Sequence, residues 1–100
     1  TLKIKIASLL SCTNQLFPGQ SANCTVWLWN MDTSGSVTAS LSYGDGSASQ
    51  AVSVTGSNVL SHYQHIYNST NAYTATLTVS PYGLTSTQSI IVQQGKLENT

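Results

Sequence analysis

The chain has 100 residues, of which 40% are hydrophobic and only 6% are charged, with three basic and three acidic side chains. This length fits one domain, and three lysines cannot form the basic patch that nucleic acid requires, so we expect neither a two-lobed enzyme nor a nucleic-acid-binding protein. No apolar run approaches the roughly 20 residues that cross a bilayer, so we expect no direct membrane insertion.

Apolar and polar residues alternate with a period of two along much of the chain, whereas no stretch keeps the three- and four-residue spacing of an amphipathic helix. Gly, Pro, Asn and Asp gather between the alternating segments and mark turns. We expect strands, in chain order, at residues 2–10, 22–29, 36–43, 49–54, 58–66, 73–80 and 85–92. About seven short strands in a chain of this length predict an all-β sandwich.

The two cysteines, Cys12 and Cys24, flank a turn signal at residues 17–20, which read Phe-Pro-Gly-Gln. Two thiols without neighbouring ligands do not make a zinc site. In an oxidising compartment they can bridge the two ends of a hairpin-like excursion, whereas in a cytosolic protein they would stay as two buried thiols. We favour the disulfide.

Ser, Thr, Asn and Gln take the place of charge in this composition. Two sequons, at Asn23 and Asn68, are acceptors for N-linked glycans if the chain passes through a eukaryotic secretory route. Sequons also arise by chance in sequence rich in Ser and Thr, so each alone is weak evidence. Together with the disulfide, they predict an extracellular or cell-surface glycoprotein, with this chain as one part of a larger ectodomain.

The segment at residues 41–47, Leu-Ser-Tyr-Gly-Asp-Gly-Ser, resembles the aromatic-Gly-Asp-Gly-Ser motif that ends a strand in PKD (polycystic kidney disease) domains. Residues 65–67, His-Ile-Tyr, are similar to the family's His-x-Tyr, and residues 72–79 resemble its Tyr-x-Val-x-Leu-x-Val strand. These pieces stand in the family's order and span about residues 20 to 92. Leu41-Ser42 replace the usual Trp-Asp, and Ala72 replaces a frequent Gly.

The resemblance implies an immunoglobulin-like β-sandwich with antiparallel or mixed sheets, generally extracellular and without catalysis. The motif also makes physical sense by itself, because glycine reaches backbone angles closed to other residues and an aspartate can bind nearby backbone amides. A tyrosine at the start of a strand can bury its ring while its hydroxyl finds a backbone acceptor. We therefore expect structural roles for Tyr43, Gly44, Asp45, Gly46, His65, Tyr67 and Tyr73.

Several kinds of chemistry are disfavoured by the spacing of the polar residues. His62 and His65 are three apart on an expected strand, which sends their side chains to opposite faces unless a bulge intervenes. Calcium would need Asp32, Asp45 and Glu98, which lie in three separate regions, although a sandwich could bring Asp32 and Asp45 together at one end. No Gly-x-Ser-x-Gly elbow and no glycosidase-like carboxylate pair is present. We expect no catalytic residues, no metal and no cofactor.

Trp27 and Trp29 alternate with two aliphatic residues, so their strand has apolar side chains on both faces. If Asn23 carries a glycan it must point outward, and parity then places both tryptophans outward with it. The pair would form a contact patch. Alternatively, one tryptophan belongs to the core, or both are covered by a neighbouring segment such as residues 2–10.

We expect one PKD-like domain over residues 1–94, followed by a linker or tail at residues 95–100. The expected function is a non-catalytic adhesion or spacer module that contacts neighbouring domains of its own chain and extracellular protein partners. Weak contacts of this kind gain strength when repeated along an array. The alternative is an accessory domain of a secreted hydrolase that presents Trp27 and Trp29 to a polysaccharide or a fibrous protein.

Overall fold

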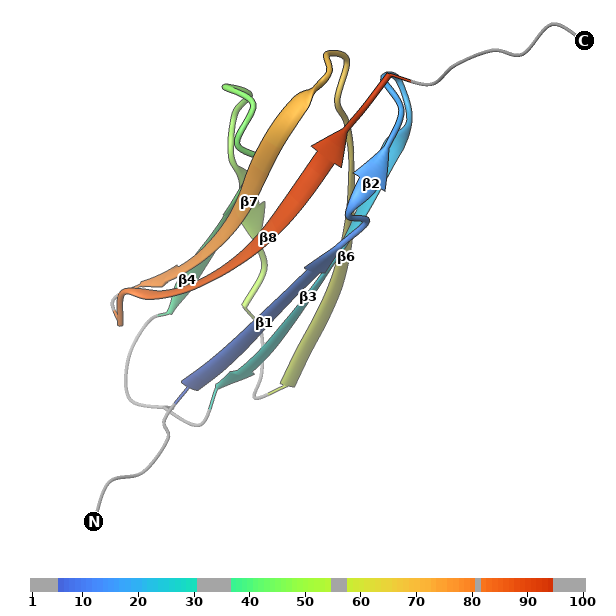
Figure 1. Cartoon of the computed structure of the whole chain (residues 1–100). Coiled ribbons are helices and arrows are strands. Elements are labelled where there is room, and N and C mark those ends of the chain that lie inside the picture. Colours follow the sequence, from blue (N-terminus) through green and yellow to red (C-terminus); the bar gives the residue numbers. More distant parts are fainter. Residues whose placement is uncertain (1–5, 31–36, 55–57, 81, 95–100) are drawn as a thin grey trace, which may run out of the picture.

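The computed structural model describes residues 6–30, 37–54, 58–80 and 82–94. These residues contain strands and turns, and nothing in them forms a helix long and apolar enough to cross a membrane (Figure 1). The strands are β1 (Ile6–Cys12), β2 (Gln15–Leu16), β3 (Ser21–Asn30), β4 (Thr38–Ser42), β5 (Gln50–Val52), β6 (Asn58–Ile66), β7 (Asn71–Ser80) and β8 (Leu84–Val92).

The strands form two sheets that pack face to face, which confirms the predicted all-β sandwich (Figure 1). One sheet has three antiparallel strands in the order β1-β3-β6. The other has five strands in the order β2-β8-β7-β4-β5, in which only the pairing of β2 with β8 is parallel. The sheets are thus antiparallel and mixed, as expected.

The core lies between the two sheets and is built from every second residue of the long strands. In β3 the buried side chains are Ala22, Cys24, Val26 and Leu28, and in β7 they are Ala75, Leu77 and Val79. The residues between them, mostly hydroxyl-bearing in β7, point away from the core. Period-two alternation in the sequence therefore sets which face of each strand is removed from water.

One side of the sandwich is closed by a strand that changes sheets. After β1 the chain crosses to the second sheet as β2, where the backbone N–H of Ile91 donates to the Asn14 carbonyl at 2.9 Å and that of Gln93 to the Leu16 carbonyl at 2.9 Å. On the same side, the hydroxyls of Ser8 and Ser86 lie 2.9 Å apart. Strand β2 was not expected, because two residues carry no periodicity.

The observed bounds of the other strands lie close to the predicted ones. The strand predicted at 58–66 has those bounds, and the one predicted at 22–29 extends by one residue at each end. β1 continues to Cys12, whereas residues 2–5 of the strand predicted there lie outside the described residues. The tail predicted at 95–100 also lies outside them.

The two cysteines form the expected disulfide. Cys12 and Cys24 are cross-strand neighbours in the register of β1 and β3, and their sulfurs are bonded. The excursion between them contains the predicted turn, in which Gln20 N donates to the Phe17 carbonyl at 3.1 Å. Gly19 has φ +87° in this turn, a conformation that a side chain disfavours.

Candidate functional site

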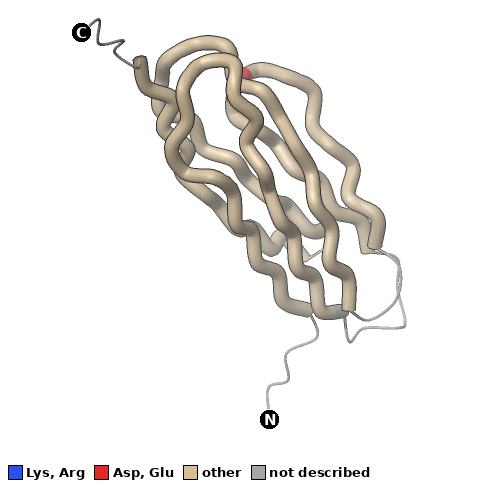
Figure 2. The backbone as a smooth tube through the Cα atoms, turned by 90° about the vertical axis from the view of Figure 1, so that its right-hand side faces the viewer, with Lys and Arg blue, Asp and Glu red and all other residues tan. Residues whose placement is uncertain are grey.

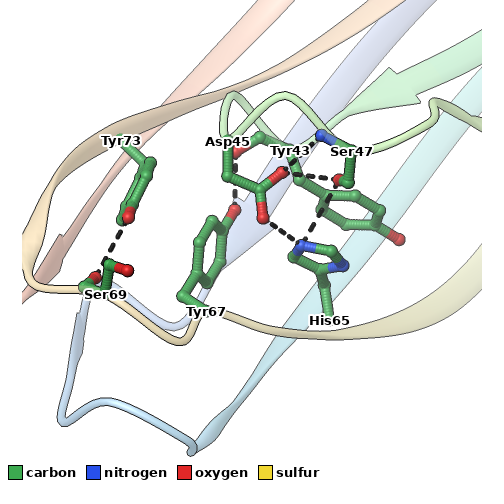
Figure 3. Close-up of polar contacts among 7 residues, drawn as sticks. All are labelled: Tyr43, Asp45, Ser47, His65, Tyr67, Ser69 and Tyr73. Carbon is green, nitrogen blue, oxygen red and sulfur yellow. Dashed lines mark hydrogen bonds and ion pairs between the residues drawn. The ribbon is translucent and has the colours of Figure 1, made fainter.

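The Tyr-Gly-Asp-Gly-Ser segment forms a corner between β4 and β5, beside the end of β6 (Figure 3). Tyr43 directly follows β4, His65 lies near the end of β6, and Tyr67 follows β6. We call Tyr43, Asp45, Ser47, His65 and Tyr67 the corner cluster. β4 and β6 belong to different sheets, so contacts within the corner cluster join the two layers of the sandwich.

The two glycines of the corner share an unusual backbone conformation, but only Gly44 also lies close to another strand. Both have positive φ, +79° at Gly44 and +85° at Gly46. A Cβ on Gly44 would overlap the backbone carbonyl of Thr74 on β7, whereas a Cβ on Gly46 would meet only open space. Gly44 therefore permits a close approach of two backbones as well as an unusual conformation.

Asp45 connects the corner to β6 through its carboxylate. Oδ1 accepts hydrogen bonds from the backbone N–H of Ser47 at 3.1 Å and from its hydroxyl at 2.5 Å. Oδ2 lies 2.6 Å from Nε2 of His65. Burial by itself would raise the pKa of Asp45, but the bonds from His65 and Ser47 outweigh it and lower the pKa to about 2.

The lowered pKa of Asp45 predicts an acid-dependent loss of stability. Its contribution is fully present above the ordinary pKa of 3.8 and is lost as the pH falls through about 2, because the unfolded chain takes up the proton first. We expect the difference in unfolding free energy between wild type and Asp45→Asn to shrink as the pH falls below about 5 in urea unfolding experiments. A difference that stays constant with pH contradicts this prediction.

Four aromatic rings continue from the corner into the end of the sandwich. The rings of Tyr43 and His65 stack with centroids 4.0 Å apart, Tyr67 meets His65 edge-on at 4.9 Å, and Tyr73 lies 4.7 Å from Tyr67. The Tyr73 hydroxyl donates to the Ser69 carbonyl at 3.0 Å, the backbone acceptor expected for it. This is the geometry of a tyrosine corner.

Tyr67 is the most deeply buried member of the corner cluster. It is 1% exposed, and its hydroxyl donates to the Tyr43 carbonyl at 2.7 Å across the two sheets. Desolvation raises the pKa of Tyr67 to about 12, so the hydroxyl keeps its proton and stays a donor at neutral pH. The buried Tyr43 carbonyl thereby has a hydrogen-bond donor in place of the water that it would bind in the unfolded chain.

Tyr67→Phe isolates this hydrogen bond. The ring stays and the Tyr43 carbonyl loses its donor, so we expect the free energy of unfolding to fall by about 1–3 kcal/mol in urea titrations. Tyr82→Phe is the control, because Tyr82 is 39% exposed whereas Tyr67 is buried. An equal effect of the two substitutions would show that the bond between the sheets does not stabilise the fold.

A second feature lies on the outer surface of the three-stranded sheet. Leu9, Trp27 and Leu60 are directly opposite one another on β1, β3 and β6 and form an apolar row, with Trp29 two residues along β3. Leu9 and Leu60 are 50% and 54% exposed, and Trp29 is 37% exposed. Trp27, between the two leucines, is half-buried. We call Leu9, Trp27, Trp29 and Leu60 the outer face.

Charge is nearly absent from the part of the chain that the structure describes. Asp45 is its single acidic residue, and no Lys or Arg occurs there (Figure 2). The outer face thus carries no formal charge among the described residues. Asn23 is exposed on the same side of β3, and Asn68 is exposed after β6. Glycosylation at both asparagines stays a prediction.

No family model and no curated protein matches the sequence. Among solved structures, the PKD domain of an M14-like peptidase from a Thermoplasmatales archaeon is similar at 12% identity and TM-score 0.72, over 87% of this chain and 93% of that one. The fold is that of a PKD domain. A CARDB domain from Pyrococcus furiosus, solved in complex with di-metal ions, is similar at 12% identity and TM-score 0.70, over 88% of this chain and 87% of that one.

In this PKD-like sandwich the corner cluster contains Ser, His and Asp side chains in contact, but not in the order of a catalytic triad. A triad base faces its nucleophile with one ring nitrogen and its orienting carboxylate with the other. Here Asp45 and the Ser47 hydroxyl both approach Nε2 of His65, at 2.6 Å and 3.5 Å, and the hydroxyl donates to Asp45. Ser47 and Asp45 therefore do not occupy the two separate ring nitrogens that a triad base uses, and these bonds join the corner to β6 instead.

The two histidines occupy opposite faces of β6, as their odd separation predicts. His65 points into the corner cluster, and His62 is exposed with Nδ1 3.2 Å from the Thr25 hydroxyl on β3. Within the described ranges, no three His, Cys, Asp or Glu side chains gather closely enough to hold a metal ion. Asp32 and Glu98, considered above for calcium, lie outside these ranges.

Sequence reasoning identified the residues of the corner cluster except Ser47, and it missed part of the outer face. The tryptophans are visible as an aromatic pair, but Leu9 and Leu60 join them only through the strand register. Parity along each strand predicts which side chains point outward. It does not predict which residues of two strands stand opposite each other.

Proposed function

We propose that this domain is a non-catalytic extracellular module that makes protein–protein contacts through its outer face. The apolar row of Leu9, Trp27 and Leu60 carries the proposal. Large apolar side chains that are half exposed and contiguous on one face are typical of interaction surfaces. The Asp45 carboxylate and the hydroxyls of Ser47 and Tyr67 are already engaged within the corner cluster, which leaves the outer face as the better candidate for contact with a partner.

An extracellular location is supported by the disulfide between Cys12 and Cys24 and by the exposure of both sequon asparagines. We infer that residues 1–94 act as one domain of a larger cell-surface or secreted protein, with residues 95–100 as a linker. Mass spectrometry of protein from its native source tests this directly. We expect glycans on Asn23 or Asn68 and an oxidised cysteine pair, whereas bare asparagines and reduced thiols contradict the location.

The described outer face carries no formal charge, which indicates how it would bind a partner. An uncharged surface gains little from electrostatic steering, so association relies on apolar burial and on repeated copies. Neighbouring domains of the same chain and extracellular proteins are the partners that we propose. Adhesion by many weak contacts is the corresponding role.

Beads coated with the domain test this role on cells that display the parent protein. Leu9→Ser with Trp29→Ser should reduce bead binding by about tenfold or more, because exposed aromatic and aliphatic anchors contribute most of such contacts. Thr85→Ala with Thr87→Ala changes exposed residues of β8, in the other sheet, and should leave binding unchanged. Equal binding by the two double variants contradicts the assignment of the outer face.

A second candidate is an accessory domain of a secreted hydrolase that binds polysaccharide or a fibrous protein through the tryptophans. The exposure of Trp29 on an uncharged sheet favours it, because sugar rings stack on such indoles. The exposed leucines that flank Trp27 favour a protein partner instead. Retention of the isolated domain on insoluble cellulose or chitin, lost with Trp27→Ala and Trp29→Ala, would establish the second candidate.

A further inference from the structure

β6 forms an open edge of the three-stranded sheet. It pairs with β3 along its whole length, from Ser21 opposite Ile66 to Trp29 opposite Asn58, without interruption of the register. On its other side no strand pairs with it among the described residues. The opposite edge of this sheet, β1, lies beside the closure made by β2 and β8. β6 is thus the edge of this sheet that has no partner strand among the described residues.

This edge lacks the features that usually protect a sheet from pairing with another chain. Edge strands are commonly kept apart by Lys, by Pro, by bulges or by being very short. β6 has nine residues, an uninterrupted register, no proline and no Lys, Arg, Asp or Glu. It also exposes two large aliphatic side chains, Leu60 at 54% and Ile66 at 49%.

We propose that β6 pairs antiparallel with β6 of a second copy of this chain. Pairing about Tyr63 places Leu60 opposite Ile66 of the second copy, and His62 opposite Gln64 of the second copy. Leu60 and Ile66 lie on the same face, so each apolar side chain meets an apolar one and each polar side chain meets a polar one. The edge is therefore complementary to itself, which selects a second copy over a strand of another sequence.

The same register extends the outer face. Leu60 already ends the apolar row that crosses β1, β3 and β6, and Ile66 of the second copy would continue this row into a six-stranded sheet. No like charges meet along the described part of this edge, since β6 has no formal charge. The pairing deepens the proposed function and rests on it, because it gives a contact module an identical partner.

Sedimentation velocity over a wide concentration range tests the pairing. The pairing is expected for copies that carry no glycan on Asn23, because Asn23 lies opposite Gln64 and a glycan there would stand beside the edge. The oxidised domain is therefore produced without N-linked glycans. We expect a concentration-dependent dimer. Leu60→Lys with Ile66→Lys should raise the dimer Kd by about tenfold or more, because lysines then face each other in two symmetric pairs.

Leu60→Lys with Ile66→Glu is the matched variant and should restore the dimer, because each introduced lysine then faces an introduced glutamate of the second copy. Within one chain these positions are about 20 Å apart along the strand, so they gain nothing in the monomer. Thr85→Lys with Thr87→Lys adds the same charge to β8 and should leave the dimer intact. Thermal unfolding of each variant establishes that it is folded.

A wild-type domain that stays monomeric at every concentration overturns the pairing, and so does equal dissociation of the two Leu60 variants. Loss of the dimer in the β8 variant overturns it as well. These outcomes are separate from failure of the proposed function. A monomeric domain whose beads still bind cells through Leu9 and Trp29 contradicts β6 pairing alone, whereas a dimer whose beads bind independently of Leu9 and Trp29 contradicts the outer-face assignment.

Discussion

Replacing Gly44 with alanine is expected to lower the free energy of unfolding by about 3 kcal/mol or more. Two effects add at this position. A side chain at φ +79° is strained, and its Cβ would overlap the Thr74 carbonyl oxygen, which is backbone and cannot rotate away. β7 or the corner must therefore shift, which disturbs the contacts between Tyr43, Asp45 and β6. Urea unfolding at neutral pH measures the loss.

Gly46→Ala is the matched control for this prediction. Gly46 has nearly the same φ, +85°, but open space around its Cβ position. It should show only the backbone cost, about 1–2 kcal/mol. If Gly44→Ala and Gly46→Ala destabilise the domain equally, the close approach of Thr74 does not limit the corner.

Removal of the disulfide should have a comparable effect. Cys12 and Cys24 are twelve residues apart in sequence, and a bridge closing a loop of this size stabilises a fold by about 3 kcal/mol on the chain-entropy view. We expect Cys12→Ala with Cys24→Ala to lower the urea midpoint clearly. The domain has a single core between two sheets, so such a loss is a large share of its stability.

Unfolding of the reduced wild-type domain distinguishes the contribution of the disulfide bond from that of the packing of the two cysteine side chains. Reduction breaks the bond but keeps both buried sulfurs, so most of the loss should already appear before any side chain is removed. A reduced domain that unfolds at the same urea concentration as the oxidised one contradicts a stabilising role. In that case the effect of the double alanine variant would come from the space it leaves in the core.

Much of the fold follows from patterns that act within one segment. Alternation in residues 73–80 predicts β7 and its buried face, because the period of a strand is two and the neighbouring turn residues limit its length. The pairing of Cys12 with Cys24 is similarly local, since a turn between them brings both ends together. Such features depend on a few neighbouring residues, which the sequence displays directly.

Features that join distant segments are harder to predict. β2 is only two residues long, so no local pattern in the sequence predicts it. It pairs in parallel with β8, more than seventy residues away in sequence. The bond between Asp45 and His65 joins the two sheets, and the family resemblance singled out both residues without predicting their contact. The row of Leu9, Trp27 and Leu60 likewise exists only in the register of three strands.

The corner cluster accounts for how the two sheets are held at one end of the sandwich. Asp45 and Tyr43 come from the five-stranded side, and they are bound by His65 and Tyr67 from the end of β6. The carboxylate of Asp45, the single one among the described residues, is engaged in this connection. The rest of the described surface presents mainly hydroxyls, amides and the outer face, which suits a module that makes contacts without charge.

We propose that the corner cluster maintains the fold and that the outer face makes the contacts. Binding of Asp45→Asn to cells that display the parent protein tests it most directly, at neutral pH and with folding verified by circular dichroism. We expect lower stability but unchanged bead binding, because the outer face stays intact. A folded Asp45→Asn domain that no longer binds would contradict it and place the functional site at the corner.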